Sequence, residues 1–220
     1  AREGKPGPVL IDLPLDVQMA DIDYDPDKDH SLPLKEVKPD LNEIKKAVDL
    51  LLEAKAPVMI MGGGVILSGA EKEFIELAEY LQIPVITTYM AKGGIPVNHP
   101  LNARHAGIQV GQPIGNKILS ESDVVLGIGC RFTDRHTGNV AVYKKGKKFI
   151  HINIEPREIG KIIEAEIGIV SDAKLAINAM LDEVKARIPR REPCERVKAL
   201  PALREALKRK TDYDNVPIKP

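Results

Sequence analysis

The sequence predicts an α/β protein built on a doubly wound, Rossmann-like parallel sheet of about five to six strands with helices on both faces. The main indication is that short, continuously apolar runs alternate with longer segments of helical periodicity. Composition points the same way. Of the 220 residues 43% are hydrophobic but only 4% are aromatic, and there is no Trp. An aliphatic core of this kind is typical of parallel sheets that helices cover on both sides.

Each predicted element follows from its own local pattern. Helices are expected where apolar side chains recur every three or four residues, and Asp40 and Asp172 are expected to cap two of them. Strands are expected where four to seven largely apolar residues run between turn signals. The predicted strands are residues 57–61, 83–88, 123–128, 148–154 and 167–170, and the predicted helices are residues 41–54, 69–82, 113–121 and 172–187.

The regions outside this alternation predict the organisation of the chain. Residues 5–12 are expected to form a loop and a short buried strand that Pro14 closes, and residues 20–40 are rich in Asp and Pro and resemble a linker. The charged, proline-punctuated residues 188–220 resemble a second linker with one helix near 200–209. We therefore expect a flanking segment over 1–40, a central domain over 41–187 and a linker over 188–220. Because the first residue is not Met and strand-like sequence starts at once, we expect a fragment of a larger enzyme.

Charge and composition exclude several classes of function. Basic and acidic residues balance at 32 each, which gives no electrostatic case for nucleic acid or an anionic membrane. No apolar run reaches the roughly 18 residues of a membrane helix, and the first residues lack a signal peptide, so a cytoplasmic location is expected. Cys130 and Cys194 stand in contexts that indicate neither a disulfide nor a metal site. No catalytic or metal-ligating constellation is recognised that would work alone.

Ligands of open parallel sheets bind at the carboxyl ends of the strands, so the residues that follow each strand are the candidates. Gly62-Gly63-Gly64 follows the first core strand, and glycine lets a bound group approach the backbone closely. The alternative is an ordinary tight turn, and the sequence leaves both open. A standard NAD site fits poorly, because the glycine spacing is not G-x-G-x-x-G and Thr87-Thr88 stands where an acidic residue is expected.

A second glycine turn follows the strand 123–128. It carries Gly127 and Gly129 and then Arg131 and Arg135, four residues apart. Guanidinium groups match pyrophosphate oxygens with paired hydrogen bonds, so this turn indicates a phosphate site. The alternative is an exposed turn in which Asp134 pairs with the arginines.

Single polar residues follow the last two predicted strands. Asn153 is placed to bond ribose hydroxyls and Asp172 to accept from an adenine amino group, and each is equally suited to cap a helix. His151 alternates within a strand and is expected to be structural. His105 and His136 are expected in loops near the site, without an assigned role.

These residues resemble the middle domain of thiamine-diphosphate enzymes of the acetohydroxyacid synthase and pyruvate oxidase group. Residues 5–18 resemble the end of the pyrimidine-binding domain that precedes it, and residues 41–186 resemble the whole middle domain. Three stretches are more similar to the glyoxylate carboligase branch than to the acetolactate synthases. They are Arg131-Phe-x-x-Arg135-His136-Thr137-Gly138, residues 167–174 and the tail 209–220.

The resemblance implies an extended FAD whose role is structural rather than redox. The site residues that it implies are Gly62, Gly63, Gly64, Thr88, Tyr89, Met90, Ala106, Gly107, Ile108, Gln109, Val110, Gly129, Arg131, Arg135, Asn153, Ile154, Asp172 and Ala173. Of these, Arg131 and Arg135 match the phosphate turn, Asn153 and Ile154 the ribose side, and Asp172 and Ala173 the adenine end.

The resemblance also implies that thiamine diphosphate and Mg are bound outside this chain, in a homodimer or homotetramer. The full enzyme would convert two glyoxylate molecules into tartronate semialdehyde and carbon dioxide. Two alternatives remain open. One is the central domain of an acetolactate synthase. The other is a cofactor-free structural domain, which would account for Asn153 where relatives usually carry an acidic residue.

Overall fold

The computed structural model describes residues 1–28, 33–107 and 112–208. Its centre is a six-stranded sheet in the order β3-β2-β1-β4-β5-β6, and every neighbouring pair is parallel. The predicted doubly wound α/β fold is therefore confirmed. The strands are β1 (Val58–Met61), β2 (Val85–Thr87), β3 (Asn102–His105), β4 (Val124–Ile128), β5 (Lys148–Asn153) and β6 (Ile167–Val170).

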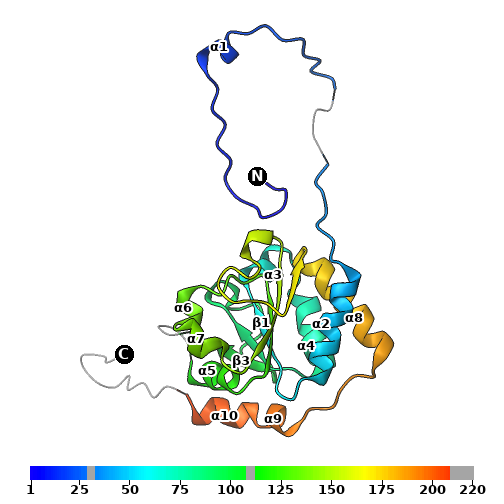
Figure 1. Ribbon diagram of the computed structural model, residues 1–220, viewed down its shortest axis with the longest axis vertical. Coiled ribbons are helices and arrows are strands. Elements are labelled where there is room, and N and C mark those ends of the chain that lie inside the picture. The colour runs from blue at the N-terminus through cyan, green and yellow to red at the C-terminus, as the bar shows by residue number, and fades with distance from the viewer. Residues whose placement is uncertain (29–32, 108–111, 209–220) are drawn as a thin grey trace, which may run out of the picture.

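Helices cover both faces of the sheet (Figure 1). On one face lie α2 (Leu41–Glu53), α4 (Glu71–Leu81) and α8 (Ala173–Arg187), and on the other α5 (Pro113–Ser120), α7 (Val140–Lys144) and α10 (Leu200–Ala206). Strand β1 shows why its side chains are apolar throughout. Met59 and Met61 pack into the first layer, whereas Val58 and Ile60 pack into the second. A strand buried on both faces needs a continuous apolar run, which is the pattern in the sequence.

The ends of the predicted helices agree with their capping residues. Asp40 Oδ1 accepts from the Asn42 amide at 2.8 Å, and α2 begins at the next residue. Asp172 caps α8 in the same manner. Helix α4 ends at Gln82, whose φ of 53° is left-handed and stops the helix before Pro84. Each side-chain N-cap stabilises its helix by about 1 kcal/mol.

The structure differs from the sequence prediction in several places. Strand β3 was not expected, because its residues Asn-Ala-Arg-His contain no apolar run; it pairs only with β2, at one edge of the sheet. The glycine segment after β1 opens a short helix, α3 (Gly63–Leu67), where only a turn was expected. The buried strand predicted within 5–12 is wrong: Val9 and Leu10 are 64% and 89% exposed, since no described strand lies beside them to pair their backbone.

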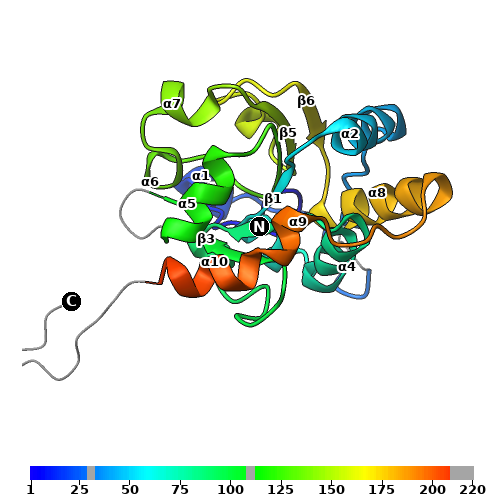
Figure 2. The same cartoon turned by 90° about the horizontal axis from the view of Figure 1, so that it is seen from below.

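The segment over residues 188–208 is attached to the domain body. Figure 2 shows α9 (Glu195–Lys198) and α10 crossing beneath the sheet. Arg196 donates to the carbonyls of Pro57 at 2.8 Å and Ile118 at 2.9 Å, and Leu200 is fully buried. The helix predicted near 200–209 is thus confirmed over Leu200–Ala206, while the proposed division of the chain at 41–187 stays a prediction.

The strand order reverses at β1, whose neighbours are β2 on one side and β4 on the other. At such a switch point the connections leave the sheet in opposite directions and a crevice opens at the carboxyl ends of the strands. The short helices η1 (Tyr89–Ala91), α6 (Asp134–Thr137) and η2 (Pro156–Glu158) follow β2, β4 and β5 at this edge.

Candidate functional site

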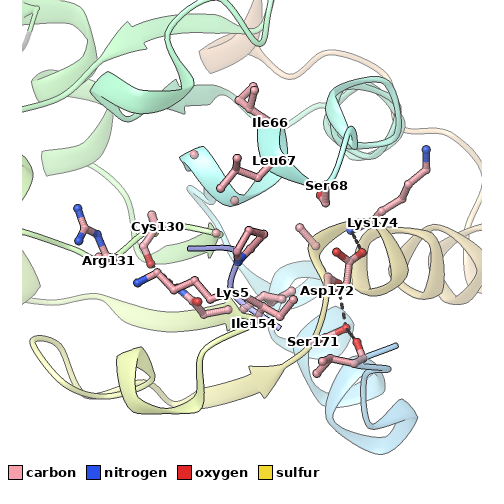
Figure 3. Close-up of a pocket in the computed structure, with 18 of the residues that line it drawn as sticks. Lys5, Ile66, Leu67, Ser68, Cys130, Arg131, Ile154, Ser171, Asp172 and Lys174 are labelled. Carbon is pink, nitrogen blue, oxygen red and sulfur yellow. Dashed lines mark hydrogen bonds between the residues drawn. The ribbon is translucent and has the colours of Figure 1, made fainter. Parts of the chain in front are cut away.

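A cavity of about 940 Å³ lies at this edge of the sheet. Its walls come from the segments that follow all six strands, together with residues 2–6 and 34–37. In the close-up, Arg131 lies at one end of the cavity and Asp172 and Lys174 lie at the other (Figure 3). The volume is at the upper end of the roughly 300–1,000 Å³ that ligand sites usually occupy, and the length suits an extended molecule.

Two glycine turns cross at the floor of the cavity. Gly62 donates to the Ile128 carbonyl and Gly64 donates to the Gly129 carbonyl, each at 2.9 Å. A β-carbon on Gly62 would meet the Gly129 carbonyl oxygen at 2.3 Å. These glycines are therefore required by the contact of one backbone with the other. The tight-turn interpretation of Gly62 and Gly64 is supported, and Gly63 and Gly64 also face the cavity.

The turn after β4 presents Arg131 to the cavity. Its neighbour Phe132 has a left-handed φ of 49°, which a bulky residue adopts only when its surroundings hold it there. The Phe132 ring is buried and makes edge contacts with Phe149 at 5.7 Å and His151 at 5.0 Å between ring centroids. The exposed Arg131 side chain makes no hydrogen bond or ion pair with any residue in the described ranges. Its charge is thus available to a ligand, and Asp134 does not neutralise it.

The carbonyl of Cys130 is held from β5 by two donors. His151 Nε2 and Asn153 Nδ2 each lie 2.9 Å from this oxygen. Asn153 Oδ1 in turn accepts from the Glu155 amide at 3.1 Å. The structural role expected of His151 is confirmed, and burial lowers its pKa, so the ring is neutral. Burial raises the pKa of the Cys130 thiol to about 12, which leaves it protonated and unreactive.

The predicted adenine end is formed by the start of α8. Asp172 Oδ1 accepts from the amides of Lys174 at 2.9 Å and Leu175 at 3.1 Å, so the capping interpretation holds for this oxygen. The Ser171 hydroxyl donates to the Val37 carbonyl at 3.0 Å, which ties the segment before α2 to the cavity wall. Lys174 is paired with Glu73 at 2.9 Å.

His136 lies at the cavity wall with its ring buried. Burial lowers its pKa to about 4, and its interaction with the Ala106 backbone opposes that shift only in part. The ring is therefore neutral at physiological pH. Its Nε2 atom has no hydrogen-bond partner, nor has the neighbouring Tyr143 hydroxyl, among the residues that the structure describes. His105, expected in a loop, instead ends β3 and is buried.

The lining of the cavity combines positive charge with apolar walls. Basic side chains outnumber acidic ones by six to three, which favours an anionic ligand. Ile66, Leu67, Met90, Ile152 and Leu175 supply apolar surface of the kind that aromatic rings bury against. The basic side chains are Arg2, Lys5, Lys35, Arg131, Arg135 and Lys174, and the acidic ones are Glu3, Glu36 and Asp172.

The structure brings most of the predicted site residues to this one cavity. They are Gly63, Gly64, Thr88, Tyr89, Met90, Ala106, Gly129, Arg131, Arg135, Asn153, Ile154, Asp172 and Ala173. Gly62 and Gly107 lie outside the lining, and Ile108, Gln109 and Val110 lie outside the described residues. What the residues bind remains a prediction.

Sequence reasoning missed part of the wall. Residues 2–6 and 34–37 come from the segment read as a flanking element, and Ser68, Lys174 and Asn178 were not singled out. Lys174 and Asn178 stand four residues apart on α8, so they share one face just after Asp172. That spacing was the available signal.

The described residues lack two features, a metal-ligand cluster and a membrane-spanning helix. No three His, Cys, Asp or Glu side chains in these ranges are grouped as a metal site would require. None of the helices that the structure describes has the length and apolarity to cross a bilayer.

The chain is similar in sequence to known proteins. A family model described as the thiamine pyrophosphate enzyme central domain matches residues 44–180. A glyoxylate carboligase of Escherichia coli O157:H7 is 45% identical, and the alignment covers 100% of this chain and 37% of the relative. Probable acetolactate synthase large subunits of Methanococcus aeolicus and Methanocaldococcus jannaschii are 40% and 42% identical over all of this chain and cover 39% and 38% of those proteins. The chain thus spans well under half the length of these relatives.

Proposed function

Since this chain belongs to the thiamine pyrophosphate enzymes and forms their central domain, we propose that its cavity binds FAD within a carboligase of this family. The observation that carries the proposal is Arg131, a guanidinium without a partner in the described chain, held at the end of a cavity lined mainly by basic charge. A pyrophosphate is a chemical group that such an arrangement binds with paired, charge-assisted hydrogen bonds.

The other walls fit the remaining parts of an extended dinucleotide. Arg135 follows Arg131 by four residues, belongs to α6 and also lines the cavity. At the far end, Ile154, Asp172 and Ala173 would border the sugar and the adenine. On the other side, Thr88, Tyr89 and Met90 would border the flavin ring. Asp172 already uses one oxygen for the helix cap, so affinity would come mainly from the arginines and the apolar walls.

For the whole protein we propose glyoxylate carboligase activity. Support comes from the E. coli carboligase, which is 45% identical over the full chain, against 40% and 42% for the two archaeal acetolactate synthases. Thiamine diphosphate and Mg would be held by parts of the protein outside this chain, and thiamine diphosphate would act as the electron sink. This chain would contribute the flavin site and subunit contacts. The homo-oligomer and the cytoplasmic location remain predictions.

The flavin proposal is tested by absorption spectroscopy of the full protein after incubation with FAD and desalting. We expect a retained flavin band, and weaker binding when both Arg131 and Arg135 are replaced by Ala. Each lost charge-assisted contact should weaken binding by roughly ten- to a hundredfold. Arg157→Ala is the matched control, because Arg157 is also exposed but lies outside the cavity.

A folded wild-type protein that retains no flavin would overturn the proposal and favour a purely structural domain. Binding that is unchanged in the double variant would place the flavin elsewhere. The carboligase proposal has a separate test, which is carbon dioxide release by the full protein from glyoxylate or from pyruvate. Faster turnover of pyruvate would favour the acetolactate synthase alternative.

A further inference from the structure

The backbone of the arginine turn is held at the residue before Arg131. The Cys130 carbonyl accepts from His151 Nε2 and from Asn153 Nδ2, both at 2.9 Å. His151 and Asn153 are buried, at 1% and 7% exposure, and both belong to β5. The second atom of the Asn153 carboxamide is also used, because Oδ1 accepts the Glu155 amide at 3.1 Å.

The residue after Arg131 is held as well. Phe132 is left-handed at φ 49°, and for an L-residue this conformation costs about 1–2 kcal/mol. Its ring compensates by packing among Phe149, Tyr143 and His151. Arg131 therefore stands between two anchored neighbours, while its own side chain has no partner in the described chain. The backbone of the turn therefore sets the direction in which the Arg131 side chain leaves the main chain.

We propose that Asn153 is a positioning residue, which aims Arg131 at the phosphate of the bound ligand by holding the Cys130 carbonyl, and that it is not a ribose contact. The inference rests on the proposed flavin site. It explains why an amide suits this position. An amide donates and accepts at once, and both functions are in use here.

An aspartate at this position would keep only one of the two hydrogen bonds that the Asn153 carboxamide makes. Its carboxylate could still accept from the Glu155 amide. It could not donate to the Cys130 carbonyl, and an ionised oxygen about 2.9 Å from that carbonyl would repel it. One of the two side-chain bonds to the Cys130 carbonyl would be lost, and Arg131 would move with Cys130.

The test compares Asn153→Asp with Asn178→Asp in the full protein. Asn178 lines the same cavity from α8, and its carboxamide makes no hydrogen bond with the described residues, so the control adds the same charge without touching the turn. We expect N153D to weaken FAD binding about tenfold more than N178D. In an Arg131→Ala background this difference should disappear, because the residue acts through Arg131.

Two outcomes would overturn the proposal. Equal or tighter FAD binding by N153D would identify position 153 as a ribose contact. If N153D weakens FAD binding by the same factor in the Arg131→Ala background as in the wild type, the two effects are additive. Asn153 then does not act through Arg131.

A second readout needs no flavin. Trypsin should cut after Arg131 faster in N153D than in N178D, because the turn loses its hydrogen bond from residue 153. Equal cleavage rates would show that Asn153 does not fix the Cys130 carbonyl. If the wild-type protein binds no FAD, the flavin proposal fails alone, and the cleavage rates still decide whether Asn153 fixes the arginine turn.

Discussion

Gly64 and Gly129 cross so closely that a β-carbon on Gly129 would lie 2.6 Å from the Gly64 α-carbon. The two residues come from different turns, after β1 and after β4, and Gly129 also has a left-handed φ of 63°. The floor of the cavity is therefore made by backbone against backbone.

Replacing Gly129 by Ala should destabilise the protein by about 3 kcal/mol or more, since conformational strain and a collision with the Gly64 backbone add. Chemical denaturation measures the change. Gly146→Ala is the matched control: its φ is 71°, but nothing lies within 4 Å of the added carbon, so only strain of about 1 kcal/mol is expected. Equal losses in the two variants would contradict the role given to the crossing.

Arg196 should contribute more to stability than the exposed Arg190 of the same segment. Its guanidinium is bonded to the Pro57 and Ile118 carbonyls, which Arg196→Ala would leave without those partners. We expect a loss of about 2 kcal/mol and faster hydrogen exchange over 195–206. Arg190, an exposed side chain paired with Glu79 at 3.1 Å, is the control. Arg190→Ala should cost less than about 1 kcal/mol.

His136 should make the fold sensitive to acid. Its pKa in the fold is about 4 because of burial, against an ordinary value of 6.5. A histidine kept neutral by the fold contributes full stability above pH 6.5 and loses it as pH falls from 6.5 toward 4. The loss should reach about 3 kcal/mol by pH 4. His136→Leu should flatten the unfolding free energy over this interval, leaving the smaller slope of His151. An unchanged slope would show that His136 does not cause it.

Asp123 should stabilise the approach to β1. Its carboxylate accepts from the Lys55 and Ala56 amides at 2.7 and 2.9 Å. Burial opposes ionisation here, but these bonds outweigh it and lower the pKa. The contribution is present above about pH 4 and is lost as pH falls through the lowered pKa. Asp123→Ala should cost about 2 kcal/mol at pH 7, and Asp123→Asn, which keeps one acceptor, about half. Equal costs for the two variants would mean that packing, not hydrogen bonding, matters at this position.

The sequence predicted those elements whose pattern lies within one continuous segment of the chain. Strands such as Val124–Ile128 are apolar on both faces, and α2 and α8 begin at the expected aspartates. Strand β3 was missed because an edge strand next to β2 tolerates the polar residues Asn102 and His105.

The site was predictable as a set of turns but not in its internal bonds. The hydrogen bond from Asn153 to Cys130 joins residues 23 positions apart, and no local sequence pattern predicts it. The same holds for the contact of Gly64 with Gly129, which exists only because the sheet order places β1 beside β4. From the sequence alone, these glycines are interpreted as allowing a ligand to approach the backbone. At Gly62 the group that approaches is instead the backbone of Gly129.

The exposed apolar side chains near the start of the chain have a consequence for handling these 220 residues on their own. Leu10, Ile11, Met19 and Ile22 are each more than three-quarters exposed. Such surfaces attract one another in water, so we expect the purified chain to associate reversibly as its concentration rises. Light scattering should report this as a negative second virial coefficient. Serine at these four positions should bring the coefficient toward zero and leave the melting temperature of the sheet domain unchanged.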